Sequence, residues 1–143
     1  MRPVSQKTAK QASGPALEKN AIVLCDRFYD STVAYQGYGS GIDINIIEAL
    51  YKTIFQQFLP YLTFILYADY DVIEARRKMR NLSDNTKQDN FESMDKSFYS
   101  RVHNGFMEIA KNNPERCILV DVNKTLEEII AEIMGILKDR GVV

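Results

Sequence analysis

Histidine and cysteine are scarce in this chain: its 143 residues include one histidine and two cysteines. Cys25 and Cys117 both lie inside apolar runs, where cysteine behaves as a small hydrophobic residue. So few ligands in such positions argue against a structural zinc site. We therefore predict two free, buried thiols, as in a cytosolic protein, and no metal site built from protein side chains.

An excess of either charge is also absent, since 18 Lys and Arg residues face 19 Asp and Glu residues and the formal net charge is -1. This balance gives no electrostatic footprint for nucleic acid or for a membrane surface. No apolar run approaches the roughly 20 residues that cross a bilayer. Residues 1–14 are polar and basic, unlike a signal peptide. We expect a cytoplasmic protein with no nucleic-acid or membrane partner.

The length suits one domain with a sizeable core. Residues 1–14 have no strong period, and we interpret them as a tail or the remains of a helix. Residues 15–143 form the predicted domain.

Runs that are apolar at nearly every position predict buried strands, here at residues 21–25, 61–68 and 116–122. Apolar residues at three- and four-residue steps predict helices, here at residues 44–58, 98–112 and from 125 onward. A further helix is predicted at roughly residues 72–80, because Asp69 or Asp71 can cap its start. Thr125 to Glu128 is a capping box that starts the last helix. Its predicted buried stripe is Leu126, Ile129, Ile130, Ile133 and Leu137. Strands alternating with helices predict an α/β fold, a parallel sheet with helices on both faces.

The stretch from Ala21 to Gly41 carries the most chemistry. Asp26 and Arg27 follow its apolar run, at the carboxyl end of the predicted strand, where α/β sheets bind ligands. Hydroxyl, aromatic and amide side chains and three glycines come next, among them Ser31, Thr32, Tyr35 and Gln36. These groups suit a phosphate and a flat base.

A second candidate is the basic helix near residue 76. Arg76 and Arg80 share a helix face, and Arg77 lies beside them. A polar loop follows, so residues 76–92 resemble a lid over polyphosphate. The alternative is a solvated basic helix.

The segments Asp26–Thr32 and Ala34–Gly37 closely resemble thymidylate kinase, the family that phosphorylates dTMP with ATP. The likeness extends over nearly all of the chain from about residue 15. It includes Asp69–Val72, Asp89–Glu92, which is similar to the family's D-R-[FY]-E, and Arg101–Phe106, which is similar to its R-V-R-x-G-[YF]. Asn90 and His103 stand where those motifs have arginine. The resemblance implies a P-loop nucleoside monophosphate kinase-like fold.

The resemblance also implies roles for the acceptor residues. Arg27 would bind the dTMP phosphate through its planar guanidinium, and Asp26 would orient Arg27 or contact the metal–nucleotide side. Tyr35 would pack against the deoxyribose. The residues implied to bind dTMP are Arg27, Ser31, Thr32, Tyr35 and Gln36, with Thr32 and Gln36 facing the thymine edge.

On the donor side, the resemblance implies that Arg76, Arg77 and Arg80 close over the ATP phosphates, with Mg²⁺ arriving with ATP. The implied catalytic residues are Asp26, Arg27, Arg76 and Arg80. The product would be dTDP, for dTTP synthesis.

These residues contain no G-x-x-x-x-G-K-[ST] phosphate-binding loop. In the family this loop follows the first strand, which lies between the strands equivalent to residues 21–25 and 61–68. Without that strand, two buried strand edges would lack partners, at about 1–3 kcal/mol per unpaired group. We therefore expect a sheet that lacks its first strand, and a chain that is inactive alone.

Two alternatives remain open: a non-catalytic binding or dimerisation module derived from a kinase, and another nucleoside monophosphate or deoxynucleoside kinase. The apolar helix 44–58 fits the family's homodimer interface, and plain core is its alternative.

Overall fold

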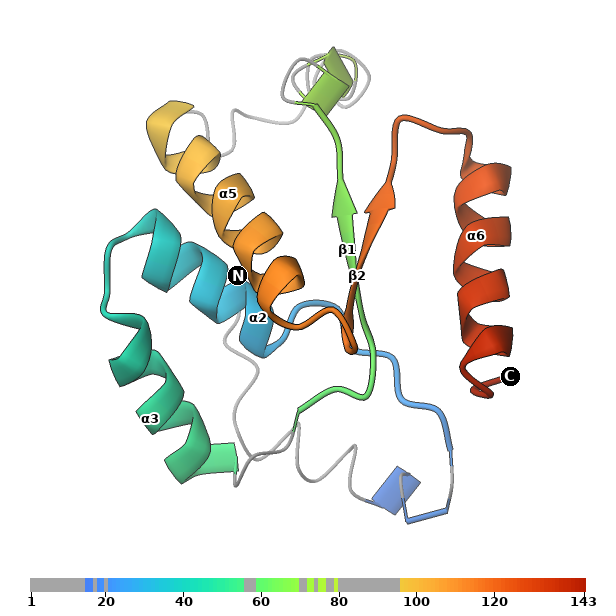
Figure 1. The fold of residues 1–143 in the computed structure, drawn as a ribbon, viewed down its shortest axis with the longest axis horizontal. Coiled ribbons are helices and arrows are strands. Elements are labelled where there is room, and N and C mark those ends of the chain that lie inside the picture. Colours follow the sequence, from blue (N-terminus) through green and yellow to red (C-terminus); the bar gives the residue numbers. More distant parts are fainter. Residues whose placement is uncertain are drawn as a thin grey trace.

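The computed structural model describes residues 15–16, 18–19, 21–55, 59–69, 72–73, 75–76, 79 and 96–143. Its elements are, in order, α2 (Tyr29–Thr32), the π-helix η1 (Val33–Gly39), α3 (Ile44–Phe55), β1 (Thr63–Tyr67), α5 (Lys96–Asn112), β2 (Cys117–Asp121) and α6 (Leu126–Asp139) (Figure 1). Residues 15, 16, 72, 73, 75, 76 and 79 are helical as well.

Strands β1 and β2 form a parallel sheet, in register from Thr63 opposite Cys117 to Tyr67 opposite Asp121. Helices α5 and α6 lie on opposite sides of the two strands (Figure 1). The main core joins residues of β1, β2, α5, η1 and α3: Val33, Ala34, Ile47, Ile65, Val102, Ile109, Ala110 and Cys117. The predicted α/β class, with a parallel sheet between helices, is confirmed.

The predicted buried strand at residues 21–25 is wrong for this structure. These residues form no strand and are exposed, and Leu24 is 92% exposed. Cys25 is exposed too, whereas Cys117 is buried as predicted. A fully apolar strand needs paired edges and covered faces, and among the described residues no strand lies beside residues 21–25. The described sheet therefore has two strands where three were predicted.

Glycines let η1 pack directly on α5. A Cβ at Gly39 would lie 2.7 Å from Val102 Cγ2, and one at Gly105 would lie 2.7 Å from the Tyr38 side chain. Real Cβ atoms essentially never approach so closely, so larger side chains would push the two helices apart. No periodic pattern predicts a helix at residues 29–39, because Ser, Thr and Gly favour turns.

A buried ion pair joins the sheet to the helical segment that α2 and η1 form together, residues 29–39. The Asp30 carboxylate, on α2, accepts two 2.8 Å hydrogen bonds from the guanidinium of Arg116, which directly precedes β2. Thr63 Oγ1, at the start of β1, donates to Asp30 at 3.1 Å. Asp30 is 5% exposed and Arg116 is 8% exposed. Hydrogen bonding to Asp30 raises the pKa of Arg116, so the guanidinium stays charged although it is buried.

Helix α6 begins as predicted, because the Thr125 hydroxyl accepts from Glu128 N–H and the Glu128 carboxylate accepts from Thr125 N–H. Its predicted stripe is not buried. Leu126 is 66% exposed, Ile130 is exposed, and the other stripe residues are half-buried. The reason is the narrow described sheet, which offers α6 little surface to cover.

Replacing Asp30 by Asn should lower the free energy of unfolding by about 3–5 kcal/mol, because it leaves the Arg116 charge buried and unpaired. Chemical denaturation of the full chain measures this. The control is Glu48→Gln, which breaks the exposed Lys52–Glu48 pair and should cost less than about 1 kcal/mol. Equal effects of the two substitutions would contradict the role of the ion pair. The double variant Asp30→Leu/Arg116→Met should recover much of the loss, since it leaves no buried charge.

Candidate functional site

The structure brings Arg27 and Tyr35 together. The guanidinium carbon of Arg27 lies 5.3 Å from the centre of the Tyr35 ring, within the range of a cation–π interaction. Arg27 has a φ of 62°, in the left-handed region, which costs a non-glycine residue roughly 1–2 kcal/mol. Such backbone strain concentrates at functional sites.

Tyr35 is held from several sides. Its ring centre lies 6.2 Å from those of Phe98 and Phe106, both on α5. Its carbonyl accepts from the Ser40 N–H at 3.0 Å and from the Ser40 hydroxyl at 3.1 Å. Tyr35 is thus a half-buried platform with an arginine above it.

The other predicted dTMP-binding residues lie on the same helical segment. Thr32 and Gln36 are exposed and four positions apart, so they share a side of the segment. Neither side chain hydrogen-bonds to another described residue. Ser31 is half-buried, and its N–H donates to the Phe28 carbonyl at 3.1 Å. The hydroxyl and amide of Thr32 and Gln36 are therefore available to a ligand.

Asp26 lies in an exposed bend. Across the part of the chain that the structure describes, no ion pair joins Asp26 to Arg27, and no three His, Cys, Asp or Glu residues could hold a metal ion. The expected position of Asp26 and Arg27 at the carboxyl edge of a strand is wrong here. Residues 21–25 are no strand, and nearby Asp30 contacts the beginnings of β1 and β2 instead.

Arg76 lies at the other end of the sheet. Its Nη2 donates to the carbonyl of Val122, just after β2, at 2.6 Å. No described contact brings Arg76 to Arg27. Arg77, Arg80 and most of the predicted lid at residues 76–92, including Asn90, lie outside the described residues.

The sequence pattern does not predict that Arg101, on α5, hydrogen-bonds to the end of η1. Its Nε donates to the Gly39 carbonyl at 3.0 Å, and its Nη1 donates to the Ser97 hydroxyl at 3.1 Å. The guanidinium also lies 5.9 Å from the centre of the Phe98 ring. Arg101 thus fastens the end of η1 to α5; the only sequence signal was its place in the Arg101–Phe106 motif.

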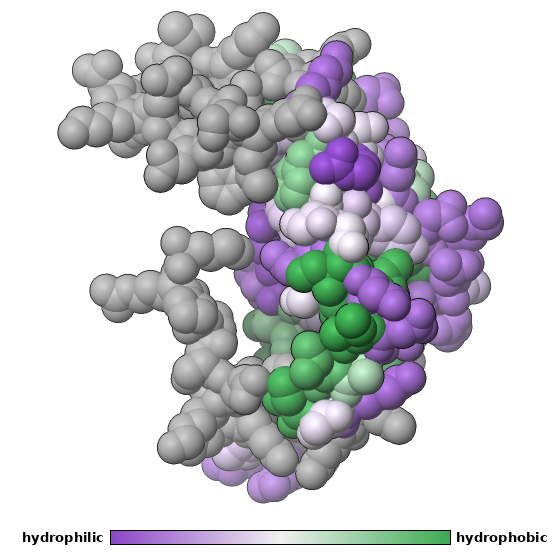
Figure 2. Space-filling view, turned by 90° about the vertical axis from the view of Figure 1, so that its left-hand side faces the viewer, coloured by the Kyte–Doolittle hydropathy of each residue, from purple (hydrophilic) through white to green (hydrophobic). Residues whose placement is uncertain are grey.

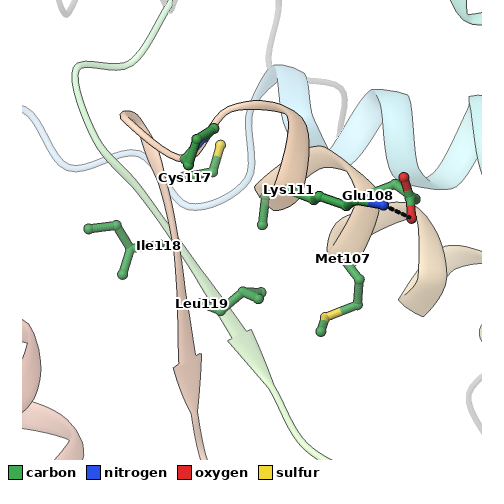
Figure 3. A pocket seen from close by; sticks show the side chains of 8 residues that line it. Met107, Glu108, Lys111, Cys117, Ile118 and Leu119 are labelled. Atoms are coloured by element: carbon green, nitrogen blue, oxygen red, sulfur yellow. Dashed lines mark ion pairs between the residues drawn. The ribbon is translucent and has the colours of Figure 1, made fainter.

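A cavity of about 500 Å³ lies elsewhere, between α5 and β2 (Figure 3). On the α5 side, the cavity is lined by Lys111 and Glu108, which form an ion pair of 3.8 Å. On the β2 side, the cavity is lined by Cys117. Burial raises the pKa of the Cys117 thiol to about 11, so the thiol is protonated at neutral pH and is a poor nucleophile. No predicted site residue lines this cavity.

The family of the chain follows from comparison with known proteins. A family model described as "Thymidylate kinase" matches residues 4–133. The chain belongs to the thymidylate kinase family. The thymidylate kinase of Wolbachia sp. subsp. Brugia malayi (strain TRS) is 41% identical to it over 125 residues, covering 83% of this chain and 57% of that protein. For the thymidylate kinase of Exiguobacterium sp. (strain ATCC BAA-1283 / AT1b), the identity is 37% over 134 residues, with 94% and 61% covered.

A solved structure agrees. The crystal structure of thymidylate kinase from Ehrlichia chaffeensis is similar with a TM-score of 0.67 and 32% identity, covering 93% of this chain and 58% of that one. The chain therefore has the fold of this family, and it spans somewhat more than half the length of these relatives. Of the described helices, none is long and apolar enough to cross a membrane.

The two thiols should differ in reactivity. At pH 8, a disulfide reagent such as Ellman's should modify one thiol of the folded chain, Cys25, and both thiols after denaturation, because Cys117 is buried. Cys25→Ser and Cys117→Ser assign the signals. Fast labelling of both thiols in the folded chain would contradict this arrangement.

Because Cys117 is buried, the free energy of unfolding should depend on pH in the alkaline range. The pKa of Cys117 is raised from 9.0 to about 11 by folding, so the unfolded chain loses this proton first. The contribution of the neutral Cys117 thiol to the free energy of unfolding is fully present below pH 9 and is lost as the pH rises toward 11. Cys117→Ala should flatten this part of the profile.

Proposed function

We propose that residues 26–36 form the dTMP side of a thymidylate kinase, and that the whole protein transfers the γ-phosphoryl group of ATP to dTMP to give dTDP. The observation that carries this proposal is the Arg27 guanidinium over the Tyr35 ring. Among the described residues no carboxylate pairs with Arg27, so its N–H donors are available to an anion. A guanidinium fork matches phosphate oxygens in two-point hydrogen bonds.

The neighbouring side chains suit the rest of dTMP. Thr32 and Gln36 present a hydroxyl and an amide on one side of the segment, as the edge of thymine requires. We assign Ser31 to the same substrate-binding group. Tyr35 offers an aromatic surface against which the deoxyribose packs.

The donor side of the proposal follows from the family. Arg76, Arg77 and Arg80 would neutralise the transferred charge, and Asp26 would contact the metal–nucleotide side. Mg²⁺ would arrive with ATP and would supply neutralisation of the phosphate charge. We propose that it is held by ATP rather than by a protein cluster. The cytoplasm, where the chain would support dTTP synthesis, is the proposed location.

These 143 residues contain no P-loop motif, so we propose that by themselves they bind the acceptor without transferring the phosphoryl group.

We also propose that α3 mediates a homodimer. Ile46, Leu50 and Ile54 recur every four residues along one side of α3 and are exposed, whereas Ile47 and Tyr51 face the core. Figure 2, which views the molecule from the side of α3, shows hydrophobic side chains gathered in a band on this surface. A contiguous exposed apolar stripe marks an interaction surface.

Binding of dTMP should raise the melting temperature of the full chain. A ligand at a hundred times its dissociation constant adds about 2.7 kcal/mol to the folded state. Arg27→Ala should abolish the shift, and Lys52→Gln, which removes a positive charge from α3, should preserve it. A cooperative melt that ignores dTMP would contradict the acceptor site. Release of ADP from ATP on addition of dTMP would contradict the proposed inactivity of the isolated chain.

The dimer is tested by sedimentation equilibrium. Leu50→Glu should shift the chain toward the monomer, because Leu50 is 56% exposed and lies in the centre of the stripe. Lys52→Glu introduces the same side chain away from the stripe and should leave the association unchanged. A wild-type chain that is monomeric at high concentration would contradict the α3 interface.

A further inference from the structure

Arg27 is exposed, and its backbone has a strained, positive φ. Its guanidinium makes a cation–π contact with the Tyr35 ring. A long exposed arginine otherwise samples many rotamers, and ordering it opposes ligand binding. A contact that already restrains the guanidinium in the free protein reduces the entropy cost of ligand binding.

Tyr35 is suited to provide that restraint, because it is itself fixed. Phe98 and Phe106 of α5 pack near its ring, and Ser40 binds its carbonyl through two hydrogen bonds. The two helices η1 and α5 pack closely at Gly39 and Gly105. Arg101 of α5 donates a hydrogen bond to the Gly39 carbonyl. The ring therefore cannot move far from its place under Arg27.

The cation–π contact with Tyr35 leaves the Arg27 guanidinium able to bind an anion. A guanidinium that lies over an aromatic face keeps its N–H groups in its own plane, so the donors remain free for phosphate oxygens. The same arginine can therefore be held by a ring and bind an anion at once.

We propose that Tyr35 is a positioning residue for the acceptor phosphate: its ring holds the Arg27 guanidinium in place before the ligand binds. This inference rests on the proposed function, because it takes dTMP as the ligand. It goes beyond packing against the deoxyribose, since Tyr35 then acts on the phosphate through Arg27. Its contribution to affinity must depend on whether the ligand carries a phosphate.

The first measurement needs no ligand. In NMR spectra of the full chain, the Arg27 side-chain protons should be shifted upfield by the Tyr35 ring current. Tyr35→Phe should keep the shift and Tyr35→Leu should remove it, with Arg27→Lys used for assignment. An Arg27 signal at its ordinary position in the wild-type chain would overturn the inference.

The second measurement compares dTMP with thymidine by calorimetry. Tyr35→Leu should weaken dTMP binding roughly 2–5-fold more than it weakens thymidine binding, which is the scale of an exposed cation–π contact. Tyr35→Phe should show no such difference. In the Arg27→Lys background, which lacks the planar fork, the extra loss for dTMP should shrink or vanish. Melting curves verify that each variant is folded, and Tyr35→Met replaces Tyr35→Leu if that variant does not melt cooperatively.

The outcomes separate the two proposals. Equal losses for dTMP and thymidine would leave the dTMP site intact and overturn the positioning role, since Tyr35 would then act on the nucleoside alone. A wild-type chain that binds neither ligand would overturn the proposed function and the positioning role with it.

Discussion

The buried pair of Asp30 and Arg116 is the interaction on which the described architecture depends. It joins α2 to the starts of both strands through two 2.8 Å hydrogen bonds, with Thr63 as a third member. Two buried charges are expensive unless their hydrogen bonds are satisfied, and no buried side-chain polar atom of the described residues lacks a partner. Since residues 21–25 are not in the sheet, this pair gives the segment that carries the candidate site, residues 26–36, a direct polar link to the strands.

The site is built on that anchor by close packing. Gly39 and Gly105 allow η1 to lie directly against α5, and Arg101 fastens its end. The π-helix then presents Tyr35 at the surface with its ring toward Arg27. π-helical turns are uncommon and occur often at functional sites, and here the wide turn is held by its contacts with α5. In the acceptor site that we propose, the Tyr35 ring, itself packed against α5, restrains the Arg27 guanidinium before an anion binds.

The exposed apolar surfaces arise from the same geometry. Residues 21–25 and the outer side of α6 carry apolar side chains without described cover, and so does one side of α3. Apolar residues that recur in helical period are normally buried against something. For α3, we interpret the stripe as an interface between two copies. For α6, the narrow sheet explains the exposure, because a helix needs a wide surface to bury a full stripe.

Much of this protein was determined by local sequence. Periodicity predicted α3, α5 and α6, and continuous apolar runs predicted β1 and β2. Thr125 and Glu128 predicted the capping box of α6. These signals depend on neighbouring residues alone. The motif around Asp26 to Gly37 indicated the family. Tertiary structure decided the rest. Burial of residues 21–25 depends on strands that pair with them, the partnership of Asp30 with Arg116 spans 86 positions, and the contact between Arg27 and Tyr35 depends on a π-helix that packing holds in place. No local pattern encodes these features, because each depends on packing against a segment that is distant in the sequence: strands beside residues 21–25, Arg116 beside Asp30, and α5 beside η1.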